Sequence, residues 1–103
     1  MCNCNNFIKA TSVEVTTDLT ESYIQITVPA TVTFDEGSLC IGLFTTIPTT
    51  IECARVVVTN GTDSLNILKC DGNYWRPCKL RCRSVLHTRV LTDPDHLLIV
   101  RGA

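Results

Sequence analysis

The stretch that decides the fold reads IECARVVVTNGTDSLNILKC from Ile51 to Cys70. Two apolar runs rich in β-branched residues flank an Asn-Gly pair, and such a pair accepts the positive φ angles of a tight type I′ turn. We therefore predict a β-hairpin, with one strand over residues 51–59 and a second, antiparallel strand over residues 65–70.

Similar short runs continue on both sides of this hairpin, with turn signals every 8 to 12 residues. Thr, Val and Ile together supply 33 residues while Ala supplies four, a balance that favours strands over helices. We predict an all-β fold, an antiparallel two-sheet β-sandwich (jelly-roll-like or immunoglobulin-like) of eight to nine short strands, with a small barrel as the alternative. The remaining expected strands cover residues 11–17, 22–28, 31–34, 39–45, 74–76, 79–91 and 96–101.

The chain has 103 residues, which leaves room for a single domain over residues 1–103. We expect residues 1–10 to form an extended arm. The N-terminal residues lack the basic region and the apolar run of a secretory signal, and no segment has the roughly 20 apolar residues of a membrane span. We therefore expect a protein that is made and kept in the cytoplasm and is not secreted by a signal peptide.

The net charge of −1 hides an asymmetry along the sequence. Residues 1–52 hold six acidic residues and one lysine, a balance of −5, whereas residues 53–103 hold eight basic and four acidic residues, a balance of +4. Such a split is able to place an acidic and a basic surface on one molecule, an arrangement that suits head-to-tail packing of identical subunits or docking to a charged neighbour. The alternative is that the two halves interleave and the charges mix.

Seven cysteines are many for this length, but an odd count without a secretion signal argues against a disulfide framework. We expect most of the thiols to be reduced and structural. The best metal-ligand candidates are Cys70, Cys78 and Cys82. Only the spacing from Cys78 to Cys82 fits a zinc knuckle, and an extended strand would hold those two residues about 13 Å apart. We therefore predict no bound metal.

The segment from Lys79 to Leu91 would, as one strand, place basic side chains on one face and apolar ones on the other. Arginine and tryptophan are enriched at protein interfaces. We predict a partner-binding patch that meets an acidic protein surface, on a copy of the same chain or on a larger assembly; its residues are Trp75, Arg76, Arg81, Arg83 and Arg89. The alternatives are a solvated strand face and a nucleic-acid-binding β-domain that uses the basic strand 79–91.

No spacing of histidine, acidic and nucleophilic residues matches a catalytic arrangement, so we expect a protein that is not an enzyme and uses no cofactor. The pattern of a helix-free, all-β chain ending on the strand Leu97-Leu98-Ile99-Val100-Arg101 resembles the small accessory proteins of tailed-phage virions. That resemblance implies a structural component, a head decoration or a head-to-tail or tail protein. Such a protein gathers in the host cytoplasm during assembly and binds copies of itself or a capsid or tail protein in the virion.

Overall fold

A computed structural model describes residues 7–17, 21–48, 53–92 and 95–101. Within these ranges the chain is built of strands, and no helix in them is long and apolar enough to cross a membrane. The strands are β1 Ile8–Lys9, β2 Ser12–Thr17, β3 Ser22–Thr27, β4 Gly37–Leu43, β5 Arg55–Thr59, β6 Ser64–Leu68, β7 Ser84–Leu91 and β8 His96–Arg101.

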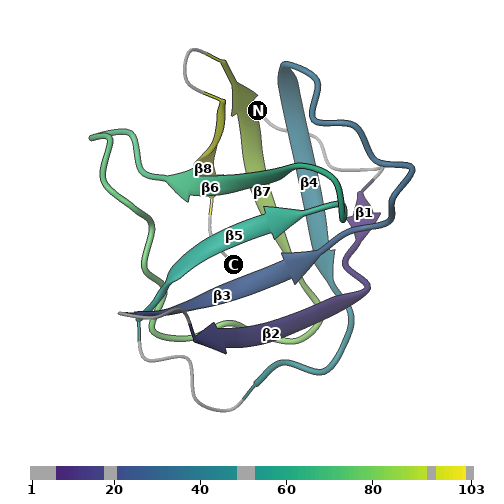
Figure 1. Cartoon of the computed structure of the whole chain (residues 1–103), viewed down its shortest axis with the longest axis vertical. Coiled ribbons are helices and arrows are strands. Elements are labelled where there is room, and N and C mark those ends of the chain that lie inside the picture. Colours follow the sequence, from purple (N-terminus) through teal and green to yellow (C-terminus); the bar gives the residue numbers. More distant parts are fainter. Residues whose placement is uncertain (1–6, 18–20, 49–52, 93–94, 102–103) are drawn as a thin grey trace.

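These strands form one mixed sheet in the order β1-β4-β7-β8-β6-β5-β3-β2. It curls into a half-barrel, with β2, β3, β5 and β6 running across the front of Figure 1 and β4 and β7 running upright behind them. The prediction of an all-β fold is confirmed, but the two-sheet antiparallel sandwich is wrong. Three pairs, β1 with β4, β3 with β5 and β6 with β8, are parallel, which alternation along the sequence does not specify.

A single short segment ties the two ends of this sheet together. β1 and β2 are the terminal strands of the sheet, yet only Ala10 and Thr11 separate them in the sequence. The backbone N–H of Ala10 donates to the carbonyl of Gly42 in β4 (2.9 Å), and the N–H of Thr11 donates to the carbonyl of Thr27 in β3 (2.7 Å). The sheet must therefore curl far enough for β4 and β3 to meet at this corner.

The core lies on the concave side of the curled sheet. The alternating strands each contribute every second residue to it, as a strand with one buried face requires. β4, which lies between β1 and β7, contributes a continuous buried run over residues 39–43. Fully buried members are Ile24, Ile26, Ile41, Leu43, Val56, Val58, Ile67, Leu86 and Leu97. Each such side chain contributes roughly 1.5–3 kcal/mol by leaving water.

The predicted hairpin is present, because β5 and β6 pair antiparallel with Thr59 opposite Ser64. Its turn spans four residues, and among the described non-glycine residues only Cys53 and Arg83 have positive φ, so the turn is not type I′. Asn60 is buried and accepts hydrogen bonds from the backbone of Thr62 and Asp63 through Oδ1. The side-chain amide of Asn60 and the positive φ of Gly61 (95°) together fix this turn.

Three other local predictions need correction. Residues 31–34 form no strand, and Val32 and Phe34 pack against the core from a loop. Residues 74–76 form only an isolated bridge between Tyr74 and Leu68. Of the expected arm, residues 8–9 are the paired strand β1, while residues 1–6 lie outside the described ranges. Residues 18–20 and 93–94, which connect expected strands, also lie outside those ranges.

The basic segment is a strand only from Ser84 onward. Arg83 has a φ of 64°, and its N–H donates to the carbonyl of Leu43, so the chain bends just before β7. The predicted alternation holds beyond that point, where Leu86 and Val90 are buried while Arg89 is exposed. The single ridge over residues 79–91 is therefore wrong in its first half, because Arg81 precedes the strand.

The cysteine prediction is also wrong. Cys53 and Cys78 form a disulfide bond, and Cys40 is disulfide-bonded as well. Of the cysteines in the described ranges, Cys70 and Cys82 are free, and both are exposed. The expectation of reduced thiols failed because the odd cysteine count says nothing about which sulfur atoms the fold brings together.

Candidate functional site

The structure distributes the five predicted partner-binding residues over separate places. The Trp75 side chain is half-buried and packs against the core, and the backbone N–H of Trp75 donates to the carbonyl of Ile67 (3.0 Å). Arg76 is exposed beside it. Arg81 and Arg83 lie in the bend before β7, and Arg89 lies near the far end of that strand, roughly 20 Å from Arg83 by strand rise. They do not form one patch on one strand.

Arg76 instead belongs to a stack of alternating tyrosine and arginine side chains, formed by Tyr23, Arg55, Tyr74 and Arg76. The Arg55 guanidinium carbon lies 4.8 Å from the ring centre of Tyr23 and 5.6 Å from that of Tyr74. The Arg76 guanidinium carbon lies 5.7 Å from the Tyr74 ring. Guanidinium groups at these distances are attracted by the negative faces of the rings. We call these four residues the Tyr-Arg stack.

Strand pairing explains the first half of the stack. Tyr23 in β3 is the register partner of Arg55 in β5, and paired residues of adjacent strands point to the same face. Their neighbours Ile24 and Val56 are fully buried, so Tyr23 and Arg55 point outward. Tyr74 comes next to them because its bridge to Leu68 places it beside β6.

Two polar contacts fix Arg55 within the stack. Its Nε donates to Oε1 of Glu21 (2.8 Å), and its Nη1 donates to Oδ1 of Asn66 on β6 (2.8 Å). The Arg55 side chain is only 17% exposed, whereas Tyr74 is 43% exposed. The stack therefore has a fixed inner part at Arg55 and presents the ring of Tyr74 and the guanidinium of Arg76 to the surroundings.

The exposed part of the stack combines an aromatic ring with a guanidinium group. Tyrosine and arginine are enriched among the residues that dominate binding free energy, and tyrosine buries much area at a low cost in conformational entropy. A guanidinium group that is already fixed in the free protein loses less side-chain conformational entropy when a partner binds. The Tyr-Arg stack is therefore suited to dock against an acidic or polar protein surface.

Sequence reasoning identified Arg76 but missed Tyr23, Arg55 and Asn66. Alternation alone predicts that Tyr23 and Arg55 point outward from their strands. Their proximity depends on the parallel pairing of β3 with β5, which are separated by β4 in the sequence. No local signal in the sequence specifies that pairing.

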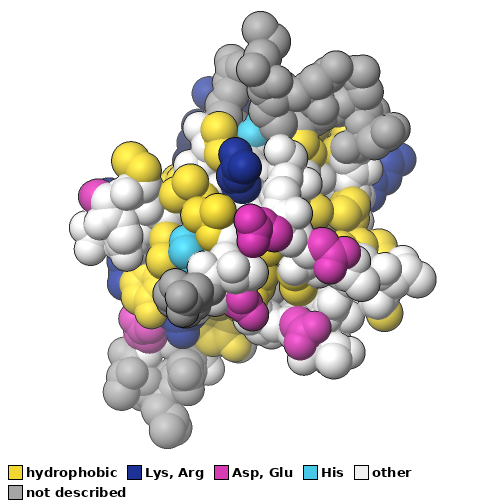
Figure 2. Space-filling view, turned by 90° about the horizontal axis from the view of Figure 1, so that it is seen from above, with side chains coloured by type: hydrophobic (Ala, Val, Ile, Leu, Met, Phe, Trp, Pro, Cys, Tyr) yellow, Lys and Arg dark blue, Asp and Glu magenta, His cyan; other side chains and the backbone are white. Residues whose placement is uncertain are grey.

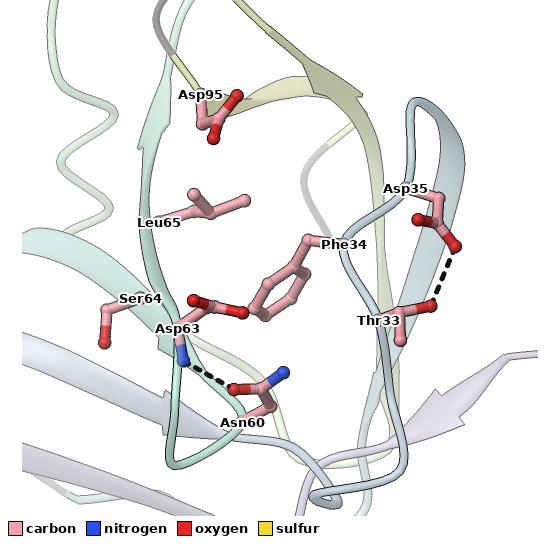
Figure 3. A pocket seen from close by; sticks show the side chains of 8 residues that line it. All are labelled: Thr33, Phe34, Asp35, Asn60, Asp63, Ser64, Leu65 and Asp95. Carbon is pink, nitrogen blue, oxygen red and sulfur yellow. Dashed lines mark hydrogen bonds between the residues drawn. The ribbon is translucent and has the colours of Figure 1, made fainter.

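A second feature is a hollow of about 430 Å³ between loops. Its lining residues are Thr33, Phe34, Asp35, Asn60, Asp63, Ser64, Leu65 and Asp95. Figure 3 shows Asp63 and Phe34 pointing toward one another from opposite walls, with Leu65 and Asp95 beyond them. Two hydrogen bonds brace the walls: Thr33 Oγ1 donates to Asp35 Oδ2 (2.8 Å), and Asn60 Nδ2 donates to the carbonyl of Val32 (2.8 Å).

This acidic hollow and the Tyr-Arg stack lie at different ends of the molecule. Figure 1 shows β3 and β5, which begin the stack, starting at the left, whereas the β5–β6 turn and the loop before β4 lie at the right. Figure 2 shows acidic side chains gathered on the face seen from above. The two halves of the sequence are interleaved in these surfaces, because Asp63 and Asp95 of the hollow belong to the basic second half and Arg55 pairs with Glu21 of the acidic first half.

The predicted metal candidates are not gathered either. Cys78 is bonded to Cys53, so it offers no thiolate beside Cys70 and Cys82. Within the described ranges no three side chains of histidine, cysteine, aspartate or glutamate form a cluster able to hold a metal ion.

In comparisons with known proteins, no family model, no curated protein and no solved structure matches this chain. The residues and their geometry are therefore the whole basis for a functional proposal.

Proposed function

We propose that this protein is a non-enzymatic assembly protein that docks its Tyr-Arg stack onto an acidic surface of a neighbouring subunit. The observation that carries the proposal is the fixed arginine at its centre. Glu21 and Asn66 hold Arg55 between two tyrosine rings, and Arg76 extends the stack outward. Such an arrangement presents a charged and aromatic surface that is already ordered before the partner arrives.

A second copy of the chain supplies an acidic surface of the required kind. The acidic hollow carries Asp35, Asp63 and Asp95 around the apolar side chains of Phe34 and Leu65. Because the stack and the hollow are different surfaces of one molecule, their contact is heterologous, and repeated contacts add subunits head to tail. The attraction is electrostatic between exposed groups and weakens as salt screens it.

Sedimentation velocity across a range of protein and salt concentrations tests this proposal. The wild type is expected to form species larger than a dimer at high concentration and low salt, and to lose them in high salt. Arg76→Glu reverses the charge at the exposed end of the stack and is expected to abolish those species. Arg89→Glu makes the same charge change on β7, outside the stack, and is the matched control.

Two results refute the proposal. A wild type that stays monomeric at the highest concentration and lowest salt has no such contact. Equal loss of association in Arg76→Glu and Arg89→Glu shows that net charge, rather than the stack, drives the assembly.

The narrower prediction of a phage virion component follows from the resemblance of the sequence pattern alone. Mass spectrometry of purified particles from the source of the protein tests it directly. Finding the chain in stoichiometric amounts supports a head or tail role; its absence from every particle fraction removes that role and leaves the assembly proposal to its own test. The nucleic-acid alternative stays a prediction, although Arg81 and Arg83 precede the strand that carries Arg89.

A further inference from the structure

The second terminal strand of the sheet, β2, has one edge that no described residue pairs with as a strand. It pairs with β3 over all six of its residues, from Ser12 opposite Thr27 to Thr17 opposite Ser22. No strand in the described ranges pairs with its other side. Alternate residues of a terminal strand aim their N–H and C=O groups away from the sheet, so this edge is a template for another strand.

The usual protections of such an edge are missing from β2. Its sequence, SVEVTT, has no proline and no lysine, its pairing register is unbroken, and Glu14 is its only charge. The opposite terminal strand, β1, has two residues and carries Lys9. Short length and lysine are both devices that discourage edge pairing, whereas β2 is long, regular and rich in β-branched residues.

The core side of this edge is covered at Val13 but only partly covered at Val15. Val13 and Val15 are paired with Ile26 and Ile24, which are fully buried, so both valines point to the core side of the sheet. Val13 is 5% exposed, but Val15 is 38% exposed. A strand added beside β2 would cover the exposed part of Val15 as well as the open backbone groups.

We propose that a second copy of this chain occupies the edge through its own β2, with the two strands antiparallel about a two-fold axis at Val15. An isologous contact needs one self-complementary surface, and an unprotected strand edge is such a surface. This contact is separate from the docking of the Tyr-Arg stack, which uses the outer face of the sheet.

Side-chain direction and charge select the register. A two-fold axis normal to the sheet keeps each face of the sheet on the same side in both subunits. Residues that point to one face of β2 therefore lie opposite residues of the partner's β2 that point to the same face. Near the strand centre, this leaves two registers, in which either Glu14 or Val15 lies opposite the same residue of the partner subunit. The first register sets two carboxylates directly opposite each other, which is destabilising. The second pairs Val15 with Val15 of the partner subunit and Glu14 with Thr16 of the partner subunit, and it removes the exposed valine surface from water.

Cysteine cross-linking tests the register. In a background with Cys70→Ser and Cys82→Ser, Val15→Cys is expected to give a covalent dimer on mild oxidation, seen on a non-reducing gel. Glu14→Cys is the matched control, one residue away, and is expected to stay largely uncrosslinked. The background without an added cysteine reports any cross-link from the remaining thiols. Absence of the Val15→Cys dimer, or an equal or larger yield from Glu14→Cys, overturns the proposal.

Sedimentation of otherwise wild-type protein separates this contact from the proposed function. Val15→Lys places a charge at the edge and is expected to weaken the dimer by about tenfold or more. Thr62→Lys, in the exposed turn, is expected to leave it intact. The β2 dimer is expected to persist in high salt and in Arg76→Glu, where head-to-tail species are lost. A wild type without a salt-resistant dimer, or one that Val15→Lys leaves unchanged, refutes the β2 contact alone.

Discussion

The strongest test of the candidate site is the removal of Arg55. In Arg55→Ala the chain loses the ion pair with Glu21, worth about 0.5 kcal/mol at this exposure, and the charged hydrogen bond to Asn66, worth about 1.5 kcal/mol. It also loses two cation–π contacts, with Tyr23 and Tyr74, at about 0.5 kcal/mol each. We expect the free energy of unfolding to fall by about 3 kcal/mol.

Urea unfolding, followed by the fluorescence of Trp75, the single tryptophan, measures this change. Arg55→Lys keeps the charge but loses the planar fork that contacts Glu21 and Asn66 together, so about half of the loss is expected to remain. Arg89→Ala, at an exposed position on β7, is expected to change stability by less than about 0.5 kcal/mol. If Arg55→Ala lowers the free energy of unfolding by less than about 1 kcal/mol, the contacts of Arg55 with Glu21, Asn66 and the two tyrosine rings do not hold the stack together.

Three further outcomes follow from other parts of the structure. The double variant Cys53→Ala, Cys78→Ala removes a disulfide that closes a loop of 25 residues. Chain entropy predicts that the free energy of unfolding, measured in urea, falls by about 3.5 kcal/mol. An unchanged unfolding midpoint would mean that the bond does not form. Gly42→Ala places a Cβ 2.6 Å from a ring atom of Phe7 and 2.7 Å from a ring atom of Phe44. The resulting overpacking is expected to lower the free energy of unfolding by about 1–3 kcal/mol in the same assay. An unchanged stability would contradict that packing. The backbone N–H of Asn73 lowers the pKa of Asp71 below its ordinary value of 3.8, so NMR titration is expected to show a midpoint below 3.8, and a midpoint at or above it contradicts this hydrogen bond. Any stability from this ionised carboxylate is fully present above pH 3.8 and is lost as the pH falls through the lowered folded-state value.

The candidate site shows where sequence reasoning stops. Arg76 was identified because an exposed arginine beside a tryptophan is a common interface pattern. The tryptophan itself packs against the core, so its position beside the stack is structural. Arg55, which holds the stack together, lies in an apolar strand, where its outward direction is predictable but its neighbours on β3 and β6 are not.

The sequence by itself determined the all-β character, the hairpin between β5 and β6, the apolar run of β4 and the inward side of β7 from Ser84 onward. These features depend on local preferences and on the two-residue period of a strand. Only the tertiary structure decided that the strands form one mixed, curled sheet, because parallel pairing joins strands that are distant in sequence. It also decided the disulfide between Cys53 and Cys78, the Tyr-Arg stack and the terminal place of β2 among the described strands, since each depends on which segments become neighbours.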